Sequence, residues 1–101
     1  MKDEVDHGIR VRVKATFENK TREELETLAD EMMEWLIAEE QRNPAITDST
    51  IGVDLSVPEF EIEVYALKSD EINSIVAAMG RLTRCVLKFG GKFNTDFLVG
   101  D

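Results

Sequence analysis

The sequence predicts an α+β fold of two layers, in which two helices cover one face of an antiparallel sheet. Three observations predict it. Some stretches alternate apolar and polar residues, as a strand with one buried face does, and others repeat apolar residues every three or four positions, as an amphipathic helix does. The two kinds follow each other as strand, helix, strand, strand, helix and a last short segment. When the strands form one layer and the helices a second layer on top of it, the apolar face of the sheet and the apolar stripes of the helices are buried against each other.

The first strand is predicted over residues 9–17, where every second residue is apolar. Its inward positions are Ile9, Val11, Val13, Ala15 and Phe17. The alternate positions Arg10, Arg12 and Lys14 give this strand a basic second face.

A helix is predicted over residues 22–42. Thr21 and Glu24 have the spacing of a capping box, in which each side chain accepts a hydrogen bond from a backbone N–H at the helix start. The dipeptide Asn43-Pro44 ends the helix, because proline disfavours a helical residue before it. The apolar stripe of this helix is Leu25, Leu28, Ala29, Met32 and Leu36, with Trp35 beside it.

Two alternating runs around Pro58-Glu59 predict a β-hairpin. The apolar positions of the first run are Ile51, Val53, Leu55 and Val57. Those of the second run are Phe60, Ile62, Val64 and Ala66, with Glu61, Glu63, Tyr65 and Leu67 at the alternate positions.

A second helix follows, capped by Ser69 or Asp70 and ended by Gly90-Gly91. Its predicted buried stripe is Ile72, Ile75, Val76, Met79, Leu82 and Val86. Gly80 inside this helix costs about 1 kcal/mol relative to alanine, so we expect a close packing contact there. Residues 92–101 form either a fourth strand or a tail.

The order β-α-β-β-α-β and the right-handedness of crossover connections place the third strand between the first two. This is the ferredoxin-like sandwich. We expect residues 1–101 to form it as a single domain, with residues 1–8 as a flexible acidic N-terminus. The basic side chains of the first strand then share a face with Glu61 and Glu63, which predicts a lattice of salt bridges.

Composition excludes several classes of partner. The 101-residue chain holds 21 acidic and 12 basic residues, for a formal charge of −9. Such a protein lacks the positive field that attracts nucleic acids and anionic membranes, so we expect neither as a partner. No stretch has the pattern of a secretory signal or a membrane span, and we therefore expect the protein in the cytoplasm.

Residues with reactive side chains are few. Cys85 is the only cysteine, which leaves no intrachain disulfide and no cysteine-based zinc cluster. A cysteine nucleophile would need an activating base, and His7 is the only histidine. We interpret His7 as part of the acidic terminus and Cys85 as a small packing residue. We predict no catalytic residue, no metal and no cofactor, and hence a protein that is not an enzyme.

Most of the net charge lies on the first helix. Residues 22–42 hold eight acidic and two basic residues, a net charge of −6. Such a face serves solubility. A sharper hypothesis is that it docks a basic protein, or mimics DNA phosphates and inhibits a nucleic-acid-binding protein. The residues that would carry this docking are Glu23, Glu26, Asp30 and Glu34.

The hypothesis we favour is a non-catalytic protein-interaction module that self-associates as a homodimer. Its surface would be the second face of the sheet, with Tyr65 and Leu67 at one end. The alternative is a small-ligand-binding regulatory domain, whose anion site would be the free N–H groups of residues 18–21. The capping box argues against that site, because Thr21 and neighbouring glutamates already occupy it.

Overall fold

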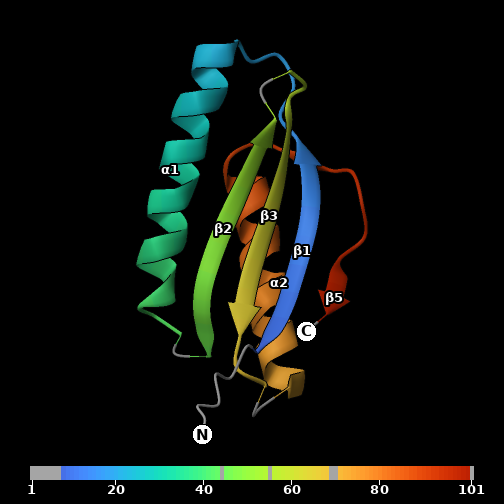
Figure 1. The fold of residues 1–101 in the computed structure, drawn as a ribbon. Coiled ribbons are helices and arrows are strands. Elements are labelled where there is room, and N and C mark those ends of the chain that lie inside the picture. Colours follow the sequence, from blue (N-terminus) through green and yellow to red (C-terminus); the bar gives the residue numbers. More distant parts are fainter. Residues whose placement is uncertain (1–7, 44, 55, 69–70, 101) are drawn as a thin grey trace, which may run out of the picture.

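The structure is a computed structural model that describes residues 8–43, 45–54, 56–68 and 71–100. Its elements follow the predicted order (Figure 1). They are β1 (Ile9–Thr16), α1 (Arg22–Glu40), β2 (Ile46–Asp54), β3 (Glu59–Ala66), α2 (Glu71–Lys88), β4 (Lys92–Phe93) and β5 (Leu98–Gly100). The predicted flexible N-terminus, apart from Gly8, lies outside the described residues, as does the predicted cap at Ser69 or Asp70.

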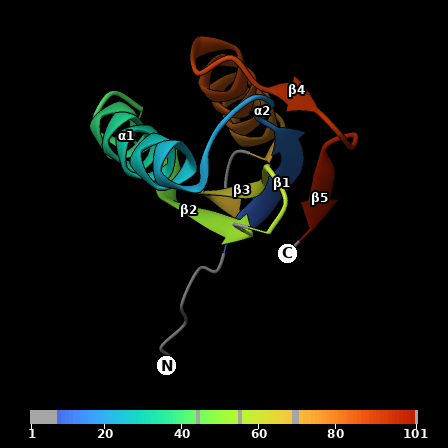
Figure 2. The ribbon, with the colours of Figure 1, turned by 90° about the horizontal axis from the view of Figure 1, so that it is seen from above.

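The sheet has the order β2-β3-β1-β4, and β5 also pairs with β1. All of these pairings are antiparallel, and β3 lies between β1 and β2 as predicted. Figure 2 shows both helices on one side of the sheet, α1 over β2 and α2 over β1. The ferredoxin-like fold is therefore confirmed. The C-terminal segment pairs with β1 in two short pieces, β4 and β5, and not as one continuous strand.

The core lies between the sheet and the helices. The predicted inward residues of β1 and β3 are all buried, because side chains on one face of a strand recur every second position. Their pairing joins Val11 to Val64 and Val13 to Ile62 on this face. From α1 the core receives Leu25, Leu28, Met32 and Leu36.

The opposite face of the sheet carries the predicted lattice of salt bridges. The register places Arg12 opposite Glu63 and Lys14 opposite Glu61. Arg12 Nη1 lies 3.9 Å from Glu61 Oε2 and 4.0 Å from Glu63 Oε2, and Arg10 Nε lies 3.7 Å from Glu63 Oε2. Arg10 and Arg12 of β1 thus pair with Glu61 and Glu63 of β3.

The predicted limits of β2 are wrong at both ends. This strand begins at Ile46, where a bulge between Ile46 and Asp48 shifts its register, and it ends at Asp54. Asp54 Oδ1 accepts a hydrogen bond from the Ser56 backbone at 2.9 Å, which starts the turn. The Ser56 hydroxyl also donates to Asp54 Oδ1, at 2.5 Å, and this bond, with the backbone bond, lowers the pKa of Asp54. Val57 consequently lies in the turn and not in the strand, and the predicted inward Leu55 lies outside the described residues.

The start of α1 and the end of α2 lie where their sequences predict. The capping box of α1 is present, with Glu24 N–H donating to Thr21 Oγ1 at 3.1 Å and Thr21 N–H donating to Glu24 Oε1 at 2.8 Å. α1 ends at Glu40, two residues earlier than predicted. After α2, Gly90 adopts a φ of +81°, and Gly91 N–H donates to the Val86 carbonyl at 2.9 Å. This left-handed turn is the Schellman arrangement that glycine favours at a helix end.

Candidate functional site

The orientation of α2 differs from the prediction. Two residues of its predicted buried stripe, Ile72 and Val76, are 78% and 64% exposed. Ile75 and Met79 are half-buried, whereas Leu82 and Val86 are buried as predicted. The residues that α2 buries are Ser74, Ala78, Arg81, Leu82, Cys85 and Val86.

Small side chains explain this orientation. Ser74, Ala78 and Cys85 lie along the line of α2 that faces β1 and β3, and they let the helix backbone approach the large inward side chains of those strands. The apolar arc of α2 is wider than the sheet can cover. Its large residues on the other side are therefore left at the surface.

The exposed Ile72, Val76 and Leu87, together with the half-buried Gly80 and Thr83, form a stripe along the helix, which we call the outer stripe. They are spaced by three or four positions, so they lie on one side of a helix with 3.6 residues per turn. Leu87, which the sequence analysis did not single out, is 64% exposed. The Thr83 hydroxyl already donates to the Met79 carbonyl at 2.8 Å, so the stripe offers mainly apolar contact.

Gly80 does not make the close packing contact that we predicted. A Cβ atom built at this position would meet only Arg84 Nη1, at 3.8 Å, which is ordinary van der Waals contact. Nothing within the described chain therefore requires a glycine at the middle of the outer stripe.

The four predicted docking residues Glu23, Glu26, Asp30 and Glu34 are all exposed on α1. Glu26 Oε1 lies 3.8 Å from Arg22 Nε, an exposed pair of the kind that contributes little stability.

The other two predicted surface residues lie elsewhere. Tyr65 is on the sheet face opposite the helices, half-buried, with its hydroxyl donating to Glu63 Oε1 at 3.4 Å. Leu67 follows the end of β3 and is half-buried. Its N–H donates to the Ala45 carbonyl at 2.8 Å. The structure thus does not join these six residues into one surface, since α1 and Tyr65 lie on opposite sides of the sheet.

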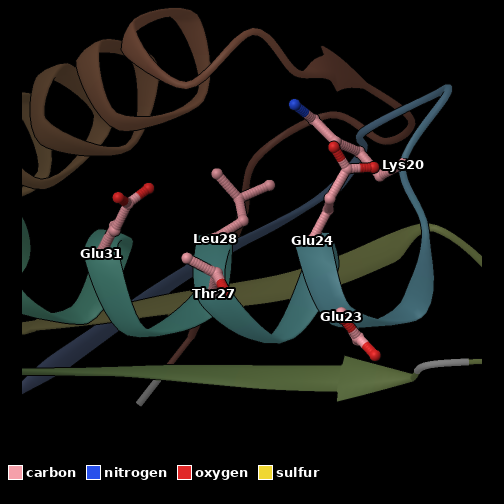
Figure 3. Close-up of a pocket in the computed structure, with 6 residues that line it drawn as sticks. All are labelled: Lys20, Glu23, Glu24, Thr27, Leu28 and Glu31. Carbon is pink, nitrogen blue, oxygen red and sulfur yellow. The ribbon is translucent and has the colours of Figure 1, made fainter.

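A shallow pocket of about 360 Å³ lies beside the start of α1. Figure 3 shows Glu24 and Glu31 on the same side of the helix, with Glu23 pointing away from them. The hydrogen bond from the Thr21 backbone lowers the pKa of Glu24. A carboxyl group that acts as a general acid near neutral pH needs a raised pKa. The same capping box occupies the helix start that the ligand-binding alternative would use.

The described residues offer little reactive chemistry. Cys85 is fully buried, and burial raises the pKa of its thiol to about 12. Its thiolate is therefore scarce at neutral pH. Within residues 8–43, 45–54, 56–68 and 71–100, no group of three or more His, Cys, Asp or Glu side chains could hold a metal ion. His7 lies outside these ranges. In the same part of the chain no helix has the length and apolarity to cross a membrane.

Solved structures share this fold. A de novo designed protein, Ferredog-Diesel, is similar with a TM-score of 0.52 at 22% identity, over 100% of this chain and 93% of that chain. An antibiotic biosynthesis monooxygenase has a TM-score of 0.49 at 17% identity, over 91% of this chain and 93% of that chain. No protein-family model and no curated protein sequence matches the chain. At 22% identity the similarity to the designed protein supports the fold alone, because one fold hosts many unrelated functions.

Proposed function

We propose that this protein is a non-catalytic protein-interaction module that forms a homodimer through the outer stripe of α2. The observation that carries the proposal is the exposure of three large apolar side chains along one helix, Ile72, Val76 and Leu87. Exposed apolar side chains aligned along one helix of an otherwise strongly charged protein are typical of an interaction surface. The surface differs from the sheet face that the sequence suggested, which is filled by the salt-bridge lattice.

The spacing of the outer stripe favours a second copy of the chain as the partner. The stripe is nearly symmetric about its middle, between positions 79 and 80. Two antiparallel copies of α2 would place Ile72 against the partner's Leu87 and Val76 against the partner's Thr83. Such a self-complementary arrangement is what a two-fold interface requires. Gly80 would lie at the crossing point, where the absence of a side chain lets two helix backbones approach.

Charge complementarity supports the antiparallel direction. α2 begins with Glu71 and ends with Lys88. In an antiparallel pair each Glu71 lies near the partner's Lys88. The two helix dipoles also point in opposite directions, which is the favourable arrangement for dipoles that lie side by side. In a parallel pair each of these residues would face a residue of its own charge.

The expected dimer is weak and reversible. Burying one large apolar side chain contributes about 1.5–3 kcal/mol. Because the three side chains are already partly buried, two copies together gain about 6–12 kcal/mol. Association costs about 4–15 kcal/mol in lost freedom. The two copies also repel each other, since each carries a charge of −9. We therefore expect added salt, which screens this repulsion, to strengthen the dimer.

Analytical ultracentrifugation of matched variants tests the proposal. The native chain should exceed its 11.4 kDa monomer mass as its concentration rises, and Ile72→Glu should return it to that mass. Ile37→Glu is the control, because Ile37 is an isoleucine on α1 with 51% exposure. A native chain that stays at 11.4 kDa at millimolar concentration, or a dimer that both variants weaken equally, would overturn the proposal.

Several observations support a non-catalytic role. The buried Cys85 thiol has a pKa raised to about 12, and the pKa of Glu24 is lowered. The pKa of Cys85 is too high for a thiolate nucleophile at neutral pH, and the pKa of Glu24 is too low for a general acid. The proposal places the module in the cytoplasm, where an unpaired cysteine stays reduced.

A second candidate function rests on α1. Glu23, Glu26, Asp30 and Glu34 are exposed at helical spacing and could dock a basic protein or mimic DNA phosphates. Competition between the native chain and duplex DNA for a purified nucleic-acid-binding protein tests this function. Replacing the four residues by Gln or Asn should abolish competition and, because it lowers the net charge from −9 to −5, should not weaken the dimer. Equal behaviour of the native and substituted chains would contradict it.

A further inference from the structure

Arg81 is buried among the core residues of α2, with only 2% of its surface exposed. Its Nη2 group donates to the Glu39 carbonyl at 2.6 Å. Its Nε and Nη1 groups are buried without a hydrogen-bond partner in the described structure. A buried guanidinium in this state is costly, because it has lost water and gained only part of the bonding that would replace it.

An open hollow of about 590 Å³ lies over Arg81, between the end of α1 and the flank of α2. Arg42 and Arg84 also line it. Both pair with the Glu39 carboxylate, Arg42 Nη1 at 3.5 Å from Oε2 and Arg84 Nη2 at 3.2 Å from Oε1. The Glu39 carboxylate therefore pairs with two guanidinium groups, and the Glu39 carbonyl accepts a hydrogen bond from a third. Even with the charge of Glu40, which also acts on Arg81, positive charge is in excess here.

The position of this charge is unusual for the molecule. The whole chain carries −9, and on the sheet face the basic residues are matched by glutamates. At the hollow the side chains of Arg42 and Arg84 are 79% and 60% exposed, so a ligand can reach them from solvent while they pair with Glu39. Guanidinium groups present paired N–H donors that match the two oxygens of a carboxylate.

The rest of the hollow limits the ligand. Val76, Ala77 and Gly80 form an apolar wall beside the arginines. The Glu39 carboxylate and the strong negative charge of the protein disfavour ligands with several negative charges. The lining thus suits a molecule with one anionic group and a short apolar body.

We propose that the hollow between α1 and α2 binds a small organic carboxylate, held by Arg42 and Arg84 above the buried guanidinium of Arg81. The bound carboxylate places a negative charge close to the partly unpaired guanidinium of Arg81. The apolar part of the ligand lies against Val76 and Ala77. This site is distinct from the helix start that the sequence suggested for a ligand, and it does not depend on dimer formation. Val76 and Gly80 border both the hollow and the outer stripe, so the test must separate the two.

Two-dimensional ¹H–¹⁵N NMR that observes backbone amides and arginine Nε–H groups tests this proposal, with sodium benzoate as the probe. Benzoate should give saturable shifts at the Arg81 Nε–H and at the amides of Ala77 and Arg84. Sodium phosphate and sodium chloride, at matched ionic strength, distinguish a carboxylate site from a general anion site. The same titration of Ile72→Glu shows whether binding survives when the dimer is removed.

Arg84→Gln should weaken benzoate binding about tenfold, because one charge-assisted hydrogen-bonding group is lost. Arg12→Gln is the control and should leave binding unchanged, since Arg12 lies on the opposite sheet face. Saturation by benzoate in the native chain and in Ile72→Glu, with loss in Arg84→Gln, supports the site. No saturable shift, equal shifts with chloride or phosphate, or equal weakening in Arg12→Gln would overturn it. Loss of binding only in Ile72→Glu would overturn its independence of the dimer.

Discussion

Replacing Gly80 by alanine should raise the stability of the single chain while weakening its dimer. Gly80 lies inside α2, and the atom nearest to an added Cβ is Arg84 Nη1 at 3.8 Å. The alanine methyl group therefore fits without strain in the isolated chain. Alanine favours an interior helix position over glycine by about 1 kcal/mol. For a domain of this size that increase corresponds to a midpoint temperature higher by about 4–8 °C.

Two measurements separate the two effects. Urea unfolding at submicromolar concentration reports the free energy of unfolding of the single chain, which should rise by about 1 kcal/mol. Ultracentrifugation at high concentration reports the dimer, which should weaken because a methyl group now lies at the proposed helix crossing. Ala38→Gly in the exposed part of α1 is the matched control. It should lose about 1 kcal/mol of stability and leave the dimer unchanged.

A Gly80→Ala chain that is less stable than the native chain at low concentration would refute the reasoning. That result would mean that a contact within the chain requires the glycine. A dimer of unchanged strength would instead refute the placement of Gly80 at the crossing of two helices.

Three further predictions concern single side chains. Cys85, buried with a thiol pKa of about 12, should resist labelling by Ellman's reagent in the native protein at pH 8 and react fully in guanidinium chloride; fast native labelling would contradict its burial. Glu24 has a pKa lowered from its ordinary 4.5, so its charged form stabilises the fold above that pH. The stability difference between the native chain and Glu24→Gln should shrink as pH falls below 4.5, and a growing difference would contradict the capping role. Arg81→Met should keep or raise the free energy of unfolding, by up to about 1 kcal/mol, because an apolar side chain replaces a partly unbonded guanidinium; a clear loss in urea unfolding would show that Arg81 serves the fold.

The sheet and its topology could be predicted because their signals are local. In β1 and β3 every second residue is apolar, and each strand is buried on one face only, so a single period determines which side chains point inward. The capping box at Thr21 and the glycine pair after α2 are also local signals, and the start of α1 and the end of α2 were predicted correctly. The charge lattice followed from the topology, since it needs only the neighbours of β1.

The orientation of α2 could not be predicted in the same way. Its apolar residues span more than one face, so periodicity alone does not say which part meets the sheet. Small residues such as Ser74 and Ala78 decided the packing, and the larger Ile72 and Val76 were left outside. A pattern of small residues at helical spacing was the signal that could have indicated this.

The hollow at Arg81 could not be predicted from the sequence either. Arg81 lies in the second half of α2, in a run of basic residues toward the negative end of the helix dipole. Its burial arises from the end of α1, whose Glu39 carbonyl accepts its hydrogen bond across 42 positions of sequence. Such a contact depends on how two helices meet and leaves no local pattern.

The most direct test of the proposed dimer is an isotope-filtered NOE experiment on a mixture of ¹³C-labelled and unlabelled chains, which reports only contacts between different copies. We predict NOEs between the methyl groups of Ile72 and those of the partner's Leu87, as the antiparallel pairing of α2 requires. Intermolecular NOEs confined to Tyr65 and Leu67, or none at a concentration where the native chain exceeds its monomer mass, would contradict self-association through the outer stripe.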